Sequence, residues 1–324
     1  GKTLGWSQFE LVTPNLGGGT GSNTGLGVRG IVGGYNVTGN TIEFITVSTL
    51  GNSQDFGDLS NSRNASTQQV CNRTRMIFGG GYDAGGWENV IDFITVASLG
   101  NATDFGDTTV KRMQLSSVNN KIRGIFGGGQ TAPSYNGTNV IDYVTIAQTG
   151  NAVDFGDTTQ EKTSIASVSS STRGVFGHGA TSPSPVGYAD FITMASTGDA
   201  TTFGNLSANN RNSLYGGGSS STRGIFFGGY ITTDIEFITI ATTGNSTDFG
   251  DLTVARFQGC GLSSSTRDVL VGNRISPGSS NGNTIDYIEI ATTGNALDFG
   301  DLAGDLASQT GYSGNANGHG GVSG

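Results

Sequence analysis

The stretch Arg123-Gly-Ile-Phe-Gly-Gly-Gly129, with the runs Ile141-Asp-Tyr-Val-Thr-Ile146 and Asp154-Phe-Gly-Asp157 that follow it, decides the fold. These three runs return in the same order along the chain. The Arg that opens each copy recurs every 44 to 50 residues, at Arg29, Arg75, Arg123, Arg173, Arg223 and Arg267. A period of this length is typical of repeat proteins, in which each unit buries its apolar face against the next.

Each repeat predicts four short β-strands, named a to d here. Strand a is the Ser/Thr-rich stretch before the Arg, such as Leu115–Val118, and strand b is the Arg run itself. Strand c is the alternating run rich in Ile, Val, Thr and aromatic residues, and strand d is the Asp-Phe-Gly segment. No segment keeps a helical period, so the sequence predicts an all-β protein. Four strands in a unit of this length are typical of a propeller blade.

Six units run from about Val28 to Ser313, and they predict a six-bladed propeller. The last strand a, near Leu306–Ser313, has no following strand b, so we expect it to complete the first blade and close the ring. The predicted domains are an N-terminal extra segment or attachment at 1–27, the propeller at 28–314 and a Gly-rich tail at 315–324. The alternative is a seventh, split blade that uses residues 1–27.

The units resemble the kelch repeat over roughly residues 28–313. The resemblance rests on a Gly doublet, two later aromatic residues and a basic residue, as in Gly127-Gly128, Tyr143, Phe155 and Lys162. One difference is that kelch units usually carry Trp where this chain carries Phe. The amino-acid sequence of the repeat units, as in Ala291–Asp301, also resembles kelch-like arrays in predicted virion proteins of bacteriophages that infect marine bacteria. This second resemblance implies a virion structural protein such as a tail fibre or appendage.

The composition excludes several classes of protein. A net charge of −9 with 16 basic residues argues against nucleic-acid binding, and no apolar run is long enough to span a membrane. Two Cys and two His, at His178 and His319, provide neither a disulfide framework nor a zinc site. We therefore expect no cofactor and no metal. Calcium at paired carboxylates such as Asp104 and Asp107 is the alternative.

Charged residues form columns through the repeats. The strand-b Arg residues are matched on strand c by Glu43, Asp92, Asp142, Asp190, Glu236 and Asp286. A second basic column precedes strand b by eleven or twelve residues, at Arg63, Arg112, Lys162, Arg211 and Arg256. Because Arg binds carboxylates in a fixed fork, we expect these columns to hold strands or blades together. In particular, Arg123 should reach Asp142 or the equivalent carboxylate of an adjacent blade. The alternative is a ring of charge around a channel.

The connections between strands b and c differ in length and sequence, whereas the c–d turns hardly change. In an up-and-down blade the b–c and d–a connections lie on the same face. We therefore expect one face of the ring to differ in sequence from blade to blade. Exposed Tyr and Trp among Ser, Asn and Gly are typical of recognition loops. The candidate binding residues on these loops are Tyr35, Trp87, Tyr135, Tyr188, Tyr230 and Arg274. The alternative is sequence drift, with the aromatic rings packed locally.

The sequence favours a non-enzymatic protein, because it shows no convergent nucleophile, base or acid pair outside the repeats. Together with the resemblance, this predicts a virion surface or tail-appendage protein. It would bind a host-surface glycan or a neighbouring virion protein through the b–c loops. The alternatives are a kelch-type protein-interaction module outside a virus, in an extracellular setting for example, and a propeller glycosidase or lectin. Homo-oligomerisation is left open.

Overall fold

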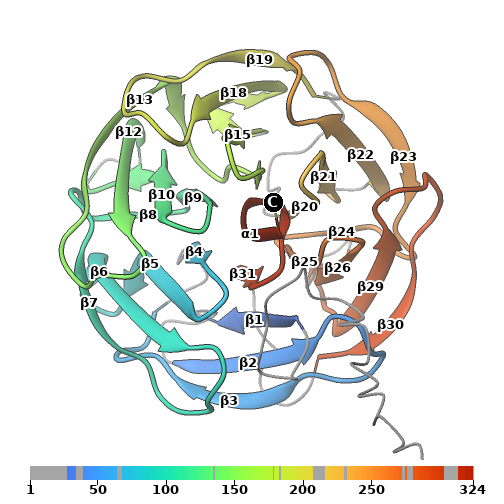
Figure 1. The fold of residues 1–324 in the computed structure, drawn as a ribbon, viewed down its shortest axis with the longest axis horizontal. Helices are drawn as coiled ribbons and strands as arrows, with labels where there is room; N and C mark the ends of the chain where they lie inside the picture. The colour runs from blue at the N-terminus through green and yellow to red at the C-terminus, as the bar shows by residue number, and fades with distance from the viewer. Residues whose placement is uncertain are drawn as a thin grey trace, which may run out of the picture.

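The computed structural model shows a ring of six antiparallel sheets (Figure 1), which confirms the prediction of an all-β, six-bladed propeller. The residues that it describes are 28–33, 39–63, 68–133, 136–177, 179–181, 184–206, 216–229, 232–271, 274–275, 280–302 and 313–323.

Each blade contains strands a to d of the repeat, from the centre of the ring outward. Blade 1 is β31 (Ser313–Ala316), β1 (Arg29–Gly33), β2 (Thr41–Thr46) and β3 (Gln54–Asp58). Blade 2 is β4 (Gln68–Cys71), β5 (Arg75–Asp83), β6 (Gly86–Thr95) and β7 (Thr103–Asp107). Blade 3 is β9 (Ser116–Asn119), β10 (Arg123–Gly127), β12 (Asn136–Thr145) and β13 (Val153–Lys162).

The other three blades repeat this order. Blade 4 is β14 (Ser167–Ser169), β15 (Arg173–Phe176), β18 (Tyr188–Thr193) and β19 (Thr201–Asn205). Blade 5 is β20 (Gly216–Ser219), β21 (Arg223–Phe227), β22 (Asp234–Thr239) and β23 (Thr247–Asp251). Blade 6 is β25 (Cys260–Ser263), β26 (Arg267–Val271), β29 (Thr284–Glu289) and β30 (Leu297–Asp301).

The C-terminal strand closes the ring, as the sequence predicts. Strand β31 pairs antiparallel with β1, from Gly30 opposite Ala316 to Gly33 opposite Ser313. The strand is Ser313–Ala316 rather than Leu306–Ser313, and residues 303–312 lie outside the described residues. The two ends of the propeller are therefore joined by hydrogen bonds within one sheet, which leaves blade 1 without a lateral edge at that point.

Residues after the closing strand are not a separate tail, so the predicted boundary at 315 is wrong. Asn315 and Ala316 belong to β31, and α1 (Gly320–Ser323) lies at the centre of the ring (Figure 1). Residues 316–322 are buried. The glycines allow this, because a Cβ on Gly321 would stand 1.8 Å from the carbonyl oxygen of Asn119.

Hydrophobic side chains fill each seam, by which we mean the interface between two consecutive blades. At seam 1/2, for example, Ile31 and Phe56 of blade 1 pack with Met76 and Phe78 of blade 2. Six such clusters surround the centre of the ring, one for each seam. The core is thus a ring of interfaces, and each blade is stable only between two neighbours.

Candidate functional site

The blade topology gives the ring two chemically different faces. The a–b and c–d turns lie at one end of the strands, which we call the uniform face. The b–c and d–a connections lie at the other end, which we call the variable face. This division follows from the antiparallel order of strands a to d in all six sheets and agrees with the sequence analysis.

Four of the six acidic residues of strand c are buried in ion pairs at the variable-face end of the blades. Its partners are the second basic column, which arrives on the linker from the preceding blade. The pairs are Arg63–Asp92, Arg112–Asp142, Lys162–Asp190 (2.8 Å) and Arg256–Asp286 (2.8 Å), all with side chains 2% exposed or less. Burial lowers the pKa of Lys162 and of the three Arg residues, and the facing Asp opposes that shift. Each pair fixes the linker from one blade onto strand c of the next blade.

The strand-b Arg residues make different contacts. The prediction that Arg123 reaches a strand-c carboxylate is therefore wrong. Arg123 donates from Nη1 to the carbonyl oxygen of Met194 in blade 4 (3.0 Å), and its guanidinium lies 4.8 Å from the centre of the Tyr143 ring. The reason is the strand register. Arg123 stands opposite Thr145, and because side chains alternate, Asp142 points to the other side of the sheet.

Every strand-b Arg stacks in this way on the aromatic residue of strand c, at 4.1 to 4.8 Å. That aromatic ring in turn meets the strand-d Phe edge to face, with centroids 5.9 to 6.2 Å apart. The repeated Arg, aromatic residue and Phe are therefore one structural unit of cation–π and ring contacts. This repeated packing explains the repeated residues without a ligand.

Hydroxyl groups that the sequence analysis did not identify donate hydrogen bonds to the acidic residues of strand c. Ser60, Thr109, Thr159 and Thr253 each stand three residues before a basic-column residue and donate to the same Asp. Two blades carry Glu instead, and there Ser53 donates to Glu43 and Ser246 to Glu236 (2.6 Å). The four Asp blades have Ala ten residues on, at Ala102, Ala152, Ala200 and Ala296. This exchange of Glu-Ser for Asp-Ala was visible in the sequence.

On the uniform face, the c–d turns form hydrogen bonds between neighbouring blades. At each seam the amide of the c–d Gly donates to the carbonyl oxygen of the strand-d Phe in the preceding blade, at 2.7 to 3.3 Å. The next side chain in the turn accepts the amide of the residue two after that Phe, at 3.0 to 3.2 Å. The acceptors are Asn52, Asn101, Asn151, Asp199, Asn245 and Asn295. The near-identity of these turns is thus a requirement of ring assembly.

The variable face carries β-structure that the common blade lacks. Strands β5 and β6 continue beyond the sheet as a hairpin in which Tyr82 stands opposite Trp87, with their rings edge to face at 5.5 Å. Over blade 3, β8 (Arg112–Met113) pairs with β11 (Gln130–Thr131), and β11 pairs with β12. Over blades 4 and 6 lie two further small sheets, formed by β16 (Gly179–Thr181) and β17 (Ser184–Val186), and by β24 (Arg256–Phe257), β27 (Arg274–Ile275) and β28 (Ser280–Asn281).

Tyr188, one of the predicted binding residues, belongs to the staple of blade 4. Lys162 lies 4.1 Å from the centre of the Tyr188 ring and donates to its carbonyl oxygen (3.3 Å). The Tyr188 hydroxyl donates to Gln160. Burial, followed by the nearby Asp190 charge, raises the pKa of Tyr188 to about 12. The ring fills space beside the one Lys in a column of Arg residues, so it has a packing role whatever else it contacts.

The remaining candidates can be placed only in part. Tyr35, Tyr135 and Tyr230 lie outside the described residues, and so do Arg211 and His178. Arg274 begins β27, and its side chain is outside the described part of the structure. Of the predicted binding residues, the structure therefore describes the side chains of Trp87 and Tyr188, and only Trp87 stands on a hairpin beyond the blade.

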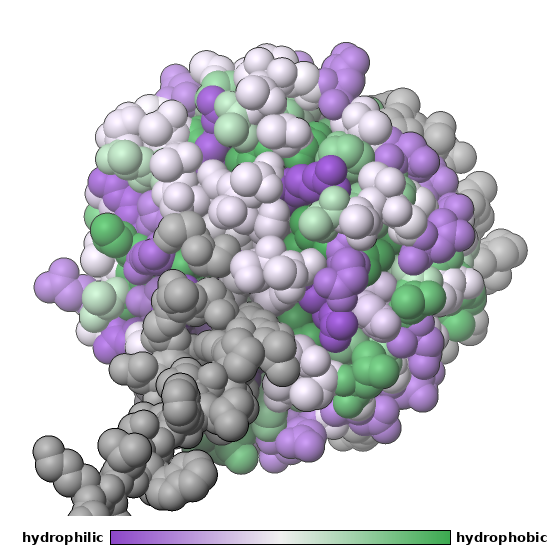
Figure 2. Space-filling view, turned by 45° about the vertical axis from the view of Figure 1, so that its right-hand side comes forward, coloured by the Kyte–Doolittle hydropathy of each residue, from purple (hydrophilic) through white to green (hydrophobic). Residues whose placement is uncertain are grey.

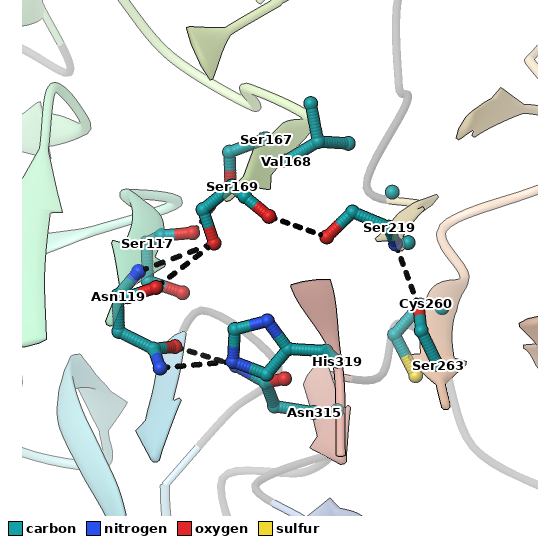
Figure 3. Close-up of a pocket in the computed structure, with 14 residues that line it drawn as sticks. Ser117, Asn119, Ser167, Val168, Ser169, Ser219, Cys260, Ser263, Asn315 and His319 are labelled. Carbon is teal, nitrogen blue, oxygen red and sulfur yellow. Dashed lines mark hydrogen bonds between the residues drawn. The ribbon is translucent and has the colours of Figure 1, made fainter. Parts of the chain in front are cut away.

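A small polar cavity of about 40 Å³ lies at the centre of the ring (Figure 3). Hydroxyl groups join its walls, with Ser219 donating to the carbonyl oxygen of Ser169 (2.8 Å) and Ser169 to that of Asn119 (3.1 Å). His319 from the C-terminal segment lies 2.8 Å from Asn119 and accepts the amide of Gly321 at Nδ1 (3.0 Å). Burial lowers its pKa to about 3, so the ring is neutral. The volume suits about three water molecules.

In the described part of the chain, no three His, Cys, Asp or Glu side chains stand together as metal ligands, so calcium at Asp104 and Asp107 gains no support. On the face that Figure 2 shows, hydrophobic residues are scattered among polar ones rather than gathered in one patch. No helix among the described residues has the length and apolar character needed to cross a membrane.

The sequence matches no model of a known protein family, and no curated protein matches it either. The resemblance to kelch repeats and to phage virion proteins therefore stays a prediction, whereas the propeller architecture is established by the structure.

Proposed function

We propose that this protein is a non-catalytic binding module that recognises its partner through the variable face. The observation that carries the proposal is where structure is added to the common blade. In the described residues, the hairpin of β5 and β6 and the small sheets around β8, β16 and β24 all lie on the variable face. Individual loops on a rigid, repeated scaffold are the usual place for recognition.

The chemistry of this face suits a glycan or a protein surface. Tyr82 and Trp87 provide aromatic rings on a short hairpin whose turn contains Asp83 and glycines. Aromatic rings beside small polar residues stack on sugar rings and also make antibody-like contacts with proteins. With the resemblance of the repeat, this favours a virion surface or tail-appendage component that binds a host-surface glycan or a neighbouring virion protein. A kelch-type interaction module outside a virus is the second candidate.

Binding experiments with a matched pair of variants test the surface. The purified protein is applied to an array of bacterial surface polysaccharides and, separately, to isolated virion proteins. Trp87→Ala should weaken any binding by about 2 kcal/mol, a loss of roughly thirtyfold, as expected of a hot spot. Thr243→Ala, in an exposed c–d turn of the uniform face, should leave affinity unchanged. Loss of binding in Thr243→Ala with full binding in Trp87→Ala would contradict the proposal.

The virion setting has its own test. A particle component should co-purify with virions through density gradients at a fixed copy number, whereas a soluble interaction module should not. Absence from purified particles would leave the kelch-type module as the better description, since that candidate requires only the variable face.

A further inference from the structure

Among the described residues, one seam differs from the other five in the bond that its strand-b Arg makes. At seams 1/2 to 5/6, the strand-b Arg donates across the seam to a carbonyl oxygen at the end of strand c in the next blade, at 2.6 to 3.2 Å. At seam 6/1 this bond is missing. Arg267 turns back onto its own blade and donates from Nε and Nη2 to Glu289, at 2.9 and 2.8 Å.

The cause is one residue. Strand register places Arg267 opposite Glu289, as it places Arg29 opposite Thr46 in blade 1. The residue opposite the Arg is Thr in the other five blades, at Thr46, Thr95, Thr145, Thr193 and Thr239. The Glu289 carboxylate offers a charged acceptor at this position, and both Nε and Nη2 of Arg267 donate to its Oε1. Glu289 therefore captures the Arg that would otherwise bridge the seam.

The bonds of the uniform face are also weakest at seam 6/1. The amide of Gly51 lies 3.3 Å from the carbonyl oxygen of Phe299, against 2.7 to 3.0 Å at the other five seams. A Cβ built on Gly300 would stand 3.1 Å from Gly51, whereas the equivalent glycines would meet the next turn at 2.1 to 2.5 Å. The blades are thus farther apart here at the position where the backbone bonds form.

The linker that leads into blade 1 differs as well. The linkers into blades 2, 3, 4 and 6 each supply the basic residue of a buried ion pair. Residues 303–312, which precede β31, contain neither Lys nor Arg. What fills seam 6/1 is a large apolar cluster that includes Val28, Cys260, Leu262 and Phe299. Apolar contacts have no preferred direction, and among the described residues this seam lacks the Arg bond that crosses the other five.

We propose that seam 6/1 is the opening point of the ring, where blade 6 and blade 1 separate locally while the other five seams stay closed. Such opening is a low-energy local event of the kind that precedes global unfolding in many proteins. It gives this propeller one defined place at which its interior can be reached from the side.

The two buried cysteines can report this opening, because each becomes reactive only when it is exposed. Cys260 is buried at seam 6/1, next to Gly314 of β31, and Cys71 is buried at seam 1/2, with its thiol 3.3 Å from the carbonyl oxygen of Ala316. Opening of seam 6/1 exposes Cys260 and leaves Cys71 covered by β31. Release of β31, or global unfolding, exposes both thiols together. The ratio of the two labelling rates therefore distinguishes these events.

The test is native-state labelling with iodoacetamide at pH 8, with each cysteine quantified by peptide mass spectrometry. Cys260 should react at least about tenfold faster than Cys71, a difference of about 1.4 kcal/mol in opening free energy. Glu289→Thr restores the residue of the other blades and should slow Cys260 severalfold without changing Cys71. The reciprocal variant Thr46→Glu diverts Arg29 at seam 1/2 and should accelerate Cys71. Equal rates for the two thiols in the wild type, or a Cys260 rate that Glu289→Thr does not change, would overturn the proposal.

Discussion

The two faces of the ring use repetition in opposite ways. On the uniform face, the same Gly and Asn or Asp stand in all six c–d turns because each turn bonds to the preceding blade. On the variable face, the repeated residues are buried beneath the surface as ion pairs such as Arg112–Asp142, and the residues above them differ from blade to blade. Repetition therefore marks the residues that assembly of the ring requires, and departure from the repeat marks positions that assembly does not constrain.

The difference also shows how a scaffold can change loops without losing its fold. The ion pairs are closed off from water, and the added strands of the variable face extend outward from them. We therefore expect sequence changes in the hairpin around Trp87 to leave the seams intact. The four predictions below test this division, from the largest expected effect to the smallest.

Loss of a buried staple should have the largest effect. Arg112→Ala leaves the Asp142 carboxylate buried without its ion partner and should lower the free energy of unfolding by about 3–5 kcal/mol. The control is Lys111→Ala. Its ammonium group is 3.9 Å from Glu88, and its side chain is 60% exposed, so its loss should change stability by less than about 0.5 kcal/mol. Urea denaturation measures both, and similar losses in the two variants would break the division between buried staples and surface charges.

The interior of the ring, rather than either face, should provide a distinct pH response. Asp268 is fully buried, and the pKa of its carboxyl rises from 3.8 to about 7, chiefly through desolvation. The folded protein then keeps a proton that the unfolded chain loses, so this group stabilises the fold at low pH. Its contribution is lost as pH rises from about 4 to about 7.

Asp268→Asn removes this titration. The variant should be more stable than the wild type at pH 8, by about 4 kcal/mol, and nearly equal to it at pH 4. Denaturation curves at both pH values give the comparison. If the difference between the two proteins is the same at pH 4 and pH 8, Asp268 does not titrate in this range.

A bond of the uniform face should have a moderate effect. Asn151→Ala removes the oxygen that accepts the amide of Asp107 across seam 2/3 (3.1 Å), and this should cost about 1 kcal/mol. Gln148→Ala in the same turn is the matched control, because that side chain is exposed and should be neutral. A neutral Asn151→Ala would mean that the repeated Asn side chains are not needed for assembly.

The variable face should be the most tolerant. Trp87→Ala should lower stability by less than about 1 kcal/mol, since the ring contacts Tyr82 on the same hairpin. Tyr188→Ala should cost more, because that ring packs against the buried Lys162. Thermal unfolding of the two variants checks the order. The reverse order would place Trp87 among the structural residues.

Much of this architecture was readable from the chain. The spacing of the Arg runs gave six units, and the strand left over at the C-terminus indicated closure with the strand that begins at Arg29. Alternation in Ile141–Ile146 identified strand c, and comparison of units separated the uniform turns from the individual loops. Of the site candidates, Trp87 and Tyr188 could be placed, and Tyr188 turned out to have a packing role.

By itself, the sequence determined the number of blades, the existence of the charge columns and the face that varies, because each of these follows from spacing along one chain. Tertiary structure alone decided which charges meet. Arg123 and Arg112 are both plausible partners of Asp142 in the sequence, but alternation across the sheet turns Arg123 toward Tyr143 and blade 4, while the linker brings Arg112 to the carboxylate. Likewise, only the pairing of β26 with β29 shows that Arg267 meets Glu289. Partners across a seam are set by register and by the spacing between blades, and neither is written in the order of residues along one strand.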